Sequence, residues 1–179
     1  DESTPYPLHY LTHYAQTKSL AEKKVLEANN KTSNALATVA LRPHLIFGPG
    51  DMNLIPRVLL AQEKGRLKIV GDGENLVDVT YIDNAADAHI MALKCLSLDH
   101  PIAGKAYFLG QGPIKLWDFT NQILKKYKRP PVNKKISLKM AYFLGWLIEG
   151  AYGLLRIYKR EPPMTRFIAL QLGKSHYFN

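Results

Sequence analysis

Short apolar runs alternate with helix-forming stretches along most of this chain, and this alternation constrains the fold most strongly. The continuous apolar run from Leu36 to Leu41 predicts a buried strand, because a strand covered on both faces does not need to alternate. It follows a helix expected over residues 11–29, and Arg42-Pro43 ends it. Strands that alternate with helices indicate an α/β fold with parallel pairing.

The elements expected further along the chain repeat this pattern. We expect short strands over residues 67–70, 76–82 and 106–109, the first two joined across Gly71–Asn75. We expect helices over residues 54–64, 83–95 and 116–127, with Asp83 as the N-cap of the second helix.

The net charge of +9 is concentrated in one segment, residues 125–160. This segment holds ten basic residues and a single acid, Glu149, and the rest of the chain is neutral. Residues 136–158 within it form the most apolar long stretch, but Glu149 interrupts it and basic residues flank it. We therefore expect a core helix pair or a helix that makes peripheral membrane contact, rather than a membrane span.

The basic segment has two alternative interpretations. A solvated basic face with no partner is the plainer alternative. Nucleic acid is not an expected partner, because no nucleic-acid motif accompanies the charge and the interleaved apolar residues suit lipid better.

The cysteine and histidine residues exclude several classes of site. The single cysteine, Cys95, rules out an internal disulfide, and we expect it to pack in a helix rather than to react. His9 and His13 have the spacing of two metal ligands on a helix, but no third ligand is near and Pro7 disfavours a helix there. We expect no metal.

No signal peptide is visible, so we expect a cytoplasmic protein that can be peripheral to a membrane.

Tyr14 and Lys18 are the residues with the clearest chemistry. Their spacing puts them on one face of the first helix. A phenol is a poor base at neutral pH, and a neighbouring ammonium group favours the phenolate. Such a pair can accept the proton of an alcohol while hydride leaves for a nicotinamide. A chain with 10 tyrosines contains a pair at this spacing by chance, so the surrounding sequence decides its weight.

That surrounding sequence resembles the extended short-chain dehydrogenase/reductase family. The Tyr-x-x-x-Lys pair is followed by the strand ending at Leu41-Arg42-Pro43, then by Ile46–Asp51, and later by Val79–His89, all in the family's order. The resemblance implies a doubly wound Rossmann-type parallel sheet with a smaller α/β substrate lobe. It also implies NAD or NADP as cofactor, with Tyr14 and Lys18 contacting it and Pro43, His44 and Leu45 beside the nicotinamide.

Within the family, the later half resembles the branch that acts on 3β-hydroxysteroids and sterol-4-carboxylates. The features that carry this resemblance are the apolar stretch 140–155, Glu161–Arg166 and His176–Phe178. We expect oxidation of a secondary alcohol on a sterol-like substrate, with Tyr14 as proton acceptor and Lys18 tuning it. The alternatives are a sugar-nucleotide epimerase or dehydratase, another extended dehydrogenase, or a non-catalytic nucleotide sensor. A homodimer is compatible with the sequence.

The sequence departs from the family in lacking the glycine-rich turn that binds the pyrophosphate. Gly71-x-Gly73 and Gly110-x-Gly112 are too short and are interpreted as turns. Ser3 is no convincing substitute for the family's catalytic serine, which we expect upstream of Tyr14. We therefore expect a fragment of a longer protein. Residues 1–46 and 83–110 would complete the nucleotide-binding domain, and residues 47–82 and 111–179 would form the substrate lobe.

Overall fold

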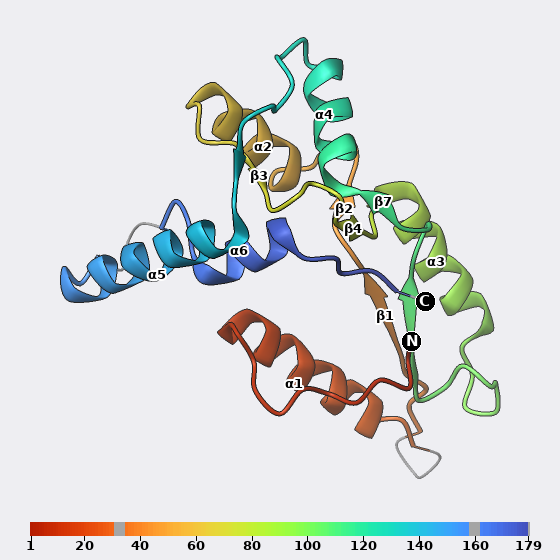
Figure 1. Ribbon diagram of the computed structural model, residues 1–179. Coiled ribbons are helices and arrows are strands. Elements are labelled where there is room, and N and C mark those ends of the chain that lie inside the picture. The colour runs from red at the N-terminus through yellow and green to blue at the C-terminus, as the bar shows by residue number, and fades with distance from the viewer. Residues whose placement is uncertain (31–34, 158–161, 179) are drawn as a thin grey trace. The chain divides into compact units, whose positions relative to one another are not determined.

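The chain folds as two compact units (Figure 1). The computed structural model describes residues 1–30, 35–157 and 162–178. Unit 1 consists of residues 1–50, 79–112 and 178–179, and unit 2 of residues 51–78 and 113–177. The sequence predicts that unit 1 completes a nucleotide-binding domain and that unit 2 is a substrate lobe. Both assignments stay predictions. Glu161 and the end of the basic segment, residues 158–160, lie outside the described residues.

Unit 1 is built on parallel strand pairs with a helix on either side. Its elements are α1 (His13–Glu27), β1 (Val39–Pro43), β2 (Ile46–Phe47), β5 (Thr80–Tyr81), α3 (Ile82–Cys95) and β6 (Lys105–Leu109). β1 pairs in parallel with β6, and β2 pairs in parallel with β5. α1 and α3 both pack against β1 (Figure 1). The parallel α/β fold expected from the sequence is confirmed.

β1 differs from the expected strand in extent and in burial. It runs from Val39 through Pro43, so Pro43 belongs to the strand instead of following it. Each of its residues is half-buried, whereas we expected a buried strand. In the described part of the chain β1 is paired along one edge only, with β6. A strand paired along one edge keeps more of its surface exposed than a central strand does.

In its described residues, unit 2 packs short strands and four helices around a small apolar core. Its elements are α2 (Leu54–Glu63), β3 (Ile69–Val70), β4 (Leu76–Val77), β7 (Ile114–Lys115), α4 (Leu116–Lys126), β8 (Lys135–Ile136), α5 (Leu138–Leu154) and α6 (Arg166–Gly173). The core contains Trp117 and Leu124 of α4 together with Val70, Val132, Ala141 and Ala169. The buried side chains of α4 recur at helical spacing, which explains why the helix forms here.

Strand pairing in and around unit 2 corrects the sequence-based expectation. The strands flanking Gly71–Asn75 do not pair with each other, because β3 pairs in parallel with β8 and β4 pairs antiparallel with β7. The run 76–82 is two strands, and the second, β5, pairs with β2 of unit 1. Ile82, the last residue of the expected run, is the first residue of α3. The N-cap of α3 is Tyr81, so Asp83 lies in the first helical turn and is not the cap.

The junction between α5 and α6 depends on a close backbone approach. A β-carbon on Gly145 of α5 would lie 2.6 Å from the backbone nitrogen of Arg166 and 2.6 Å from the carbonyl carbon of Thr165. Glu149, one turn further along α5, accepts a hydrogen bond from that same Arg166 nitrogen at 2.8 Å. Ser137 and Thr165 cap the two helices with their side chains.

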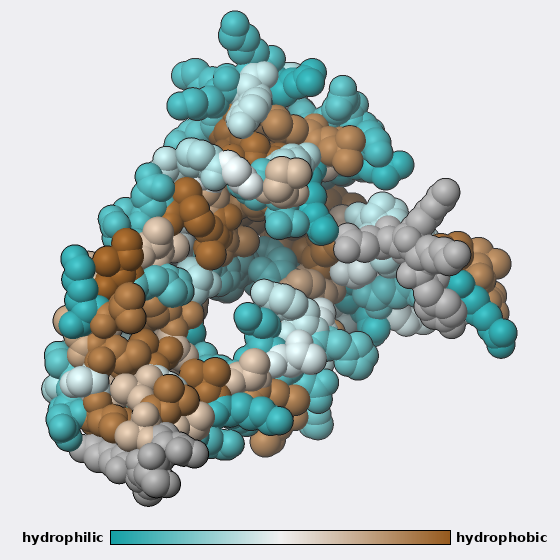
Figure 2. Space-filling model, turned by 180° about the vertical axis from the view of Figure 1, so that it is seen from behind, coloured by the Kyte–Doolittle hydropathy of each residue, from teal (hydrophilic) through white to brown (hydrophobic). Residues whose placement is uncertain are grey.

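The outer surface of α5 is strongly apolar. Phe143, Trp146 and Leu154 are 52%, 53% and 85% exposed. Tyr142 of the same helix is also exposed. Figure 2 shows that hydrophobic side chains also reach the surface in several other places on the face it draws. None of the helices in the described ranges is long and apolar enough to cross a membrane.

Candidate active site

Tyr14 and Lys18 lie in the first turns of α1, where the sequence places them. Thr12 caps this helix by accepting a hydrogen bond from the backbone nitrogen of Ala15 at 3.2 Å, which fixes where the helix begins. Both side chains are exposed, and Tyr14 is 72% exposed. The helical spacing puts the phenol and the ammonium group on the same face, one turn apart. Both groups are accessible to a small molecule from solvent.

A polar cluster joins α1 to β1 through Glu22, which lies one turn after Lys18 on α1. Arg42 of β1 forms an ion pair with Glu22 of α1, and the hydroxyl of Tyr6 donates a hydrogen bond to the same carboxylate. The guanidinium carbon of Arg42 also lies 4.9 Å from the centre of the Phe108 ring of β6. The hydrogen bond to Glu22 raises the pKa of the Tyr6 hydroxyl above its usual value. The cluster joins the helix that carries Tyr14 to the strand that leads to Pro43.

Pro43, His44 and Leu45 form the end of β1 and the turn that follows it. Leu45 has a φ of 40°, in the left-handed region that side chains other than glycine rarely adopt. The backbone nitrogen of His44 donates to the Thr80 hydroxyl at 3.3 Å. Pro43 is the register partner of Leu109, so this turn lies at the carboxyl ends of two parallel strands, β1 and β6. In open α/β sheets, ligands bind at such carboxyl ends.

Aromatic rings close one side of this turn. Phe178 packs edge-on against His44, with ring centres 5.6 Å apart, and stacks on Phe108 at 3.8 Å. Sequence reasoning singled out neither Phe178 nor Thr80 as a site residue. Thr80 lies in the family-like stretch Val79–His89 and Phe178 in His176–Phe178, but nothing in either stretch specifies a contact with His44, which is far away along the chain. All five predicted site residues lie in unit 1, on α1 and at the end of β1.

The remaining candidates from the sequence have no catalytic environment. Cys95 is exposed rather than packed, because it is the last residue of α3. Within the described ranges no group of three His, Cys, Asp or Glu residues could hold a metal ion. Gly71, Gly73 and Gly112 have φ of 80°, 90° and 90°, as expected of turn residues.

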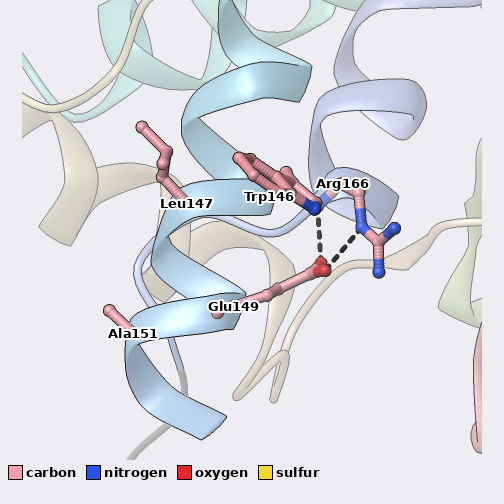
Figure 3. A pocket seen from close by; sticks show the side chains of 6 residues that line it. Trp146, Leu147, Glu149, Ala151 and Arg166 are labelled. Atoms are coloured by element: carbon pink, nitrogen blue, oxygen red, sulfur yellow. Dashed lines mark hydrogen bonds and ion pairs between the residues drawn. The ribbon is translucent and has the colours of Figure 1, made fainter. Parts of the chain in front are cut away.

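Unit 2 contains a hollow that the sequence did not indicate. It has a volume of about 480 Å³, and Trp146, Leu147, Glu149 and Arg166 are among the residues that line it (Figure 3). The Glu149 carboxylate accepts a hydrogen bond from Nε of Arg166 at 2.6 Å. The pair belongs to the α5–α6 junction, and its first role is therefore structural.

The fold described above is that of a Rossmann-type α/β protein, and a solved structure shows the same arrangement. A dTDP-glucose 4,6-dehydratase from Bacillus anthracis, solved in complex with NAD, superposes with a TM-score of 0.54 over 76% of this chain and 43% of that chain. The two sequences are 19% identical. At this identity the similarity establishes the fold alone.

The sequence itself identifies the family. The profile of the 3-beta hydroxysteroid dehydrogenase/isomerase family matches residues 1–140, and the chain belongs to this family. A 2-alkyl-3-oxoalkanoate reductase from Stenotrophomonas maltophilia is 47% identical over 99% of this chain and 53% of its own length. A decarboxylating sterol-4-alpha-carboxylate 3-dehydrogenase from Mus musculus is 36% identical over 99% of this chain and 50% of its own length. The chain thus spans about half the length of these relatives.

Proposed function

We propose that the full-length protein containing this chain is an NAD(P)-dependent oxidoreductase that interconverts a secondary alcohol and a ketone. The observation that carries the proposal is the placement of Tyr14 and Lys18. They are one turn apart on the accessible face of α1, the helix that Glu22 and Arg42 tie to β1. Membership in the family and the names of the relatives support the same reaction.

The residues at the end of β1 suit one end of a dinucleotide. The Pro43–Leu45 turn lies where parallel strands end, and the left-handed Leu45 redirects the backbone there. The glycine-rich turn for the pyrophosphate does not occur in this sequence, so this chain would supply only the nicotinamide end of the site. The bound nicotinamide would accept or donate the hydride.

Tyr14 and Lys18 would handle the proton. In the oxidation, the phenolate of Tyr14 takes the hydroxyl proton as the C–H bond breaks, which leaves a C=O bond. In the reduction, the phenol returns that proton to the carbonyl oxygen. Lys18 would stabilise the phenolate by its positive charge and bind a ribose hydroxyl. The first of these tasks requires the two groups to lie on one helical face.

The names of the relatives narrow the substrate class. A 2-alkyl-3-oxoalkanoate and a sterol-4-carboxylate both carry a carboxylate on the carbon next to the carbon that reacts. Both also carry a large apolar group. We therefore propose a β-keto acid or β-hydroxy acid with a bulky apolar substituent. A sterol-4-carboxylate belongs to this class, whereas a 3β-hydroxysteroid without a carboxylate, which the sequence also led us to expect, does not.

A substrate comparison with the full-length protein tests this function. The protein is offered a 2-alkyl-3-oxoalkanoate with NADH or NADPH, a sterol-4-carboxylate with the oxidised cofactors, and a nucleotide sugar with NAD. Nicotinamide absorbance and product analysis follow each reaction. Turnover of either carboxylate supports the proposal. Turnover of the nucleotide sugar alone would establish the epimerase or dehydratase alternative, and cofactor binding without any turnover would establish the sensor.

A second proposal concerns a membrane surface, to which α5 would bind from one side. Met140, Phe143 and Trp146 of this helix are each about half exposed. Basic residues precede and begin the helix, and Lys134, Lys135 and Lys139 are exposed. Exposed apolar groups beside basic ones favour reversible binding to an anionic lipid surface. Such contact would suit a substrate that dissolves in membranes.

A further inference from the structure

The side chain of Thr80 lies at the meeting point of three segments of unit 1. It is 1% exposed. Its hydroxyl accepts a hydrogen bond from the backbone nitrogen of His44 at 3.3 Å and donates one to the carbonyl oxygen of Leu109 at 3.0 Å. Leu109 is the last residue of β6, and His44 follows the last residue of β1. One hydroxyl therefore links the carboxyl ends of both strands.

The turn that this hydroxyl holds is strained. Leu45 has a φ of 40°, and a left-handed conformation is costly for a leucine. Its carbonyl oxygen accepts a hydrogen bond from the backbone nitrogen of Thr80 at 3.4 Å. Thr80 thus contacts both sides of the strained peptide, His44 before it and Leu45 after it. A strained conformation persists where the surrounding contacts hold it in place, and such conformations are concentrated at functional sites.

The strand itself does not require a hydroxyl at position 80. Thr80 pairs with Ile46 through its backbone in the parallel β2–β5 pair, and valine would keep that pairing and the side-chain shape. Only the hydrogen bonds to His44 and Leu109 need the oxygen. The hydroxyl is therefore separable from the strand by a single substitution.

We propose that Thr80 is a positioning residue for the cofactor. Its hydroxyl fixes the His44–Leu45 turn against the end of β6, so that the turn presents one rigid edge to the nicotinamide end of a dinucleotide. This inference rests on the proposed function, because it requires the cofactor to lie at this turn. Loss of the hydroxyl would release the strain at Leu45 and leave the edge variable. The cofactor would then have to order the turn on binding, which weakens its affinity.

The test uses three variants of the full-length protein. Thr80→Val removes the hydroxyl and Thr80→Ser keeps it. Thr120→Val is the matched control, because Thr120 is a buried threonine whose hydroxyl donates within its own helix, to Leu116 at 2.8 Å. Fluorescence titration gives the dissociation constant for NADH and NADPH, melting gives stability, and steady-state kinetics give KM for the cofactor and for the organic substrate.

We expect Thr80→Val to weaken cofactor binding about five-fold and to raise its KM, with little change in KM for the organic substrate. Thr80→Ser should stay close to wild type, and Thr120→Val should lower the melting temperature without changing cofactor affinity. Equal affinity of Thr80→Val and wild type overturns the inference. So does an equal affinity loss in Thr120→Val, which would show a general effect of instability. If the wild-type protein binds neither dinucleotide, both the proposed function and this inference fail. If the wild-type protein binds the cofactor and turns over substrate, and Thr80→Val binds the cofactor equally well, only this inference fails.

Discussion

The guanidinium group of Arg42 donates two hydrogen bonds to the carboxylate of Glu22. Nε donates to Oε2 at 2.7 Å, and Nη2 donates to Oε1 at 2.6 Å. These bonds lower the pKa of the Glu22 carboxyl and raise the pKa of the Arg42 guanidinium. Because Glu22 is on α1 and Arg42 on β1, the pair sets the helix that carries Tyr14 against the strand that ends at Pro43.

Glu22→Gln should lower the free energy of unfolding at neutral pH by about 1–2 kcal/mol, because a charge-assisted pair is lost. The pKa of Glu22 is depressed in the folded state, so its contribution is present above the unfolded pKa of about 4.3. It is lost as the pH falls through the folded pKa. Urea unfolding should therefore show a gap between wild type and Glu22→Gln at pH 7 that closes below about pH 4.

A second glutamate serves as the control for this prediction. Glu63 is 4.0 Å from Arg129, and both side chains are about half exposed or more. Exposed pairs contribute little, so Glu63→Gln should leave stability almost unchanged at both pH values. An equal effect of the two substitutions would show that the contact between Glu22 and Arg42 is not specific.

Gly145→Ala should destabilise the α5–α6 junction by about 1–3 kcal/mol, because the added methyl group would meet backbone atoms of Thr165 and Arg166 that cannot move aside alone. Gly153→Ala on the same helix is the control. A β-carbon there meets no described atom within 4 Å, so alanine should stabilise the helix by about 0.5–1 kcal/mol. Thermal melting measures both. Stabilisation by both alanines would contradict the close approach seen at Gly145.

The elements that could be predicted from the sequence are those with local signals. The helix that carries Tyr14 and Lys18 extends over His13–Glu27, inside the expected range, because its cap and its helix-forming residues are neighbours in the sequence. α2 and α4 end within a residue of their expected ends for the same reason. The i, i+4 spacing of Tyr14 and Lys18 carries over directly into a shared helical face.

The features that could not be predicted depend on contacts between distant residues. Pairing of Ile69–Val70 with Lys135–Ile136 joins segments more than sixty residues apart, and nothing in either short run specifies its partner. From the sequence alone, Thr80 is an ordinary strand residue. Its role depends on the hydrogen bond from His44, which is distant along the chain and becomes a neighbour only in the fold. The expected cap at Asp83 was wrong because strand β5 runs directly into α3, which starts one residue earlier.

The membrane proposal predicts reversible, salt-sensitive binding of the full-length protein to anionic vesicles. Binding at low salt should weaken in about 0.5 M salt and weaken further when Lys134, Lys135 and Lys139 become glutamine. The control replaces Lys64, Lys94 and Lys105, which are also exposed, and should bind as wild type does. Co-sedimentation measures each. Absence of sedimentation at low salt would remove the proposal, and binding that survives a carbonate wash would indicate a deeper insertion.

Lys18→Ala should reduce both turnover and cofactor affinity, since one ammonium group is proposed to stabilise the phenolate and to bind the ribose. Lys24→Ala, at an exposed position further along the same helix, is the control and should change neither. Steady-state kinetics and a cofactor titration separate the two effects. A variant that loses turnover with full cofactor affinity would leave Lys18 without its binding role.

The most direct measurement of the central claim is the turnover number of Tyr14→Phe in the full-length protein. The phenyl ring keeps the shape of the side chain but cannot exchange a proton, so kcat should fall by about 10²–10⁴-fold while cofactor affinity stays close to wild type. Tyr127→Phe is the matched control, because Tyr127 is also exposed and should keep full activity. A Tyr14→Phe protein that retains more than about a tenth of wild-type kcat would contradict the assignment of Tyr14 as the group that exchanges the substrate's proton.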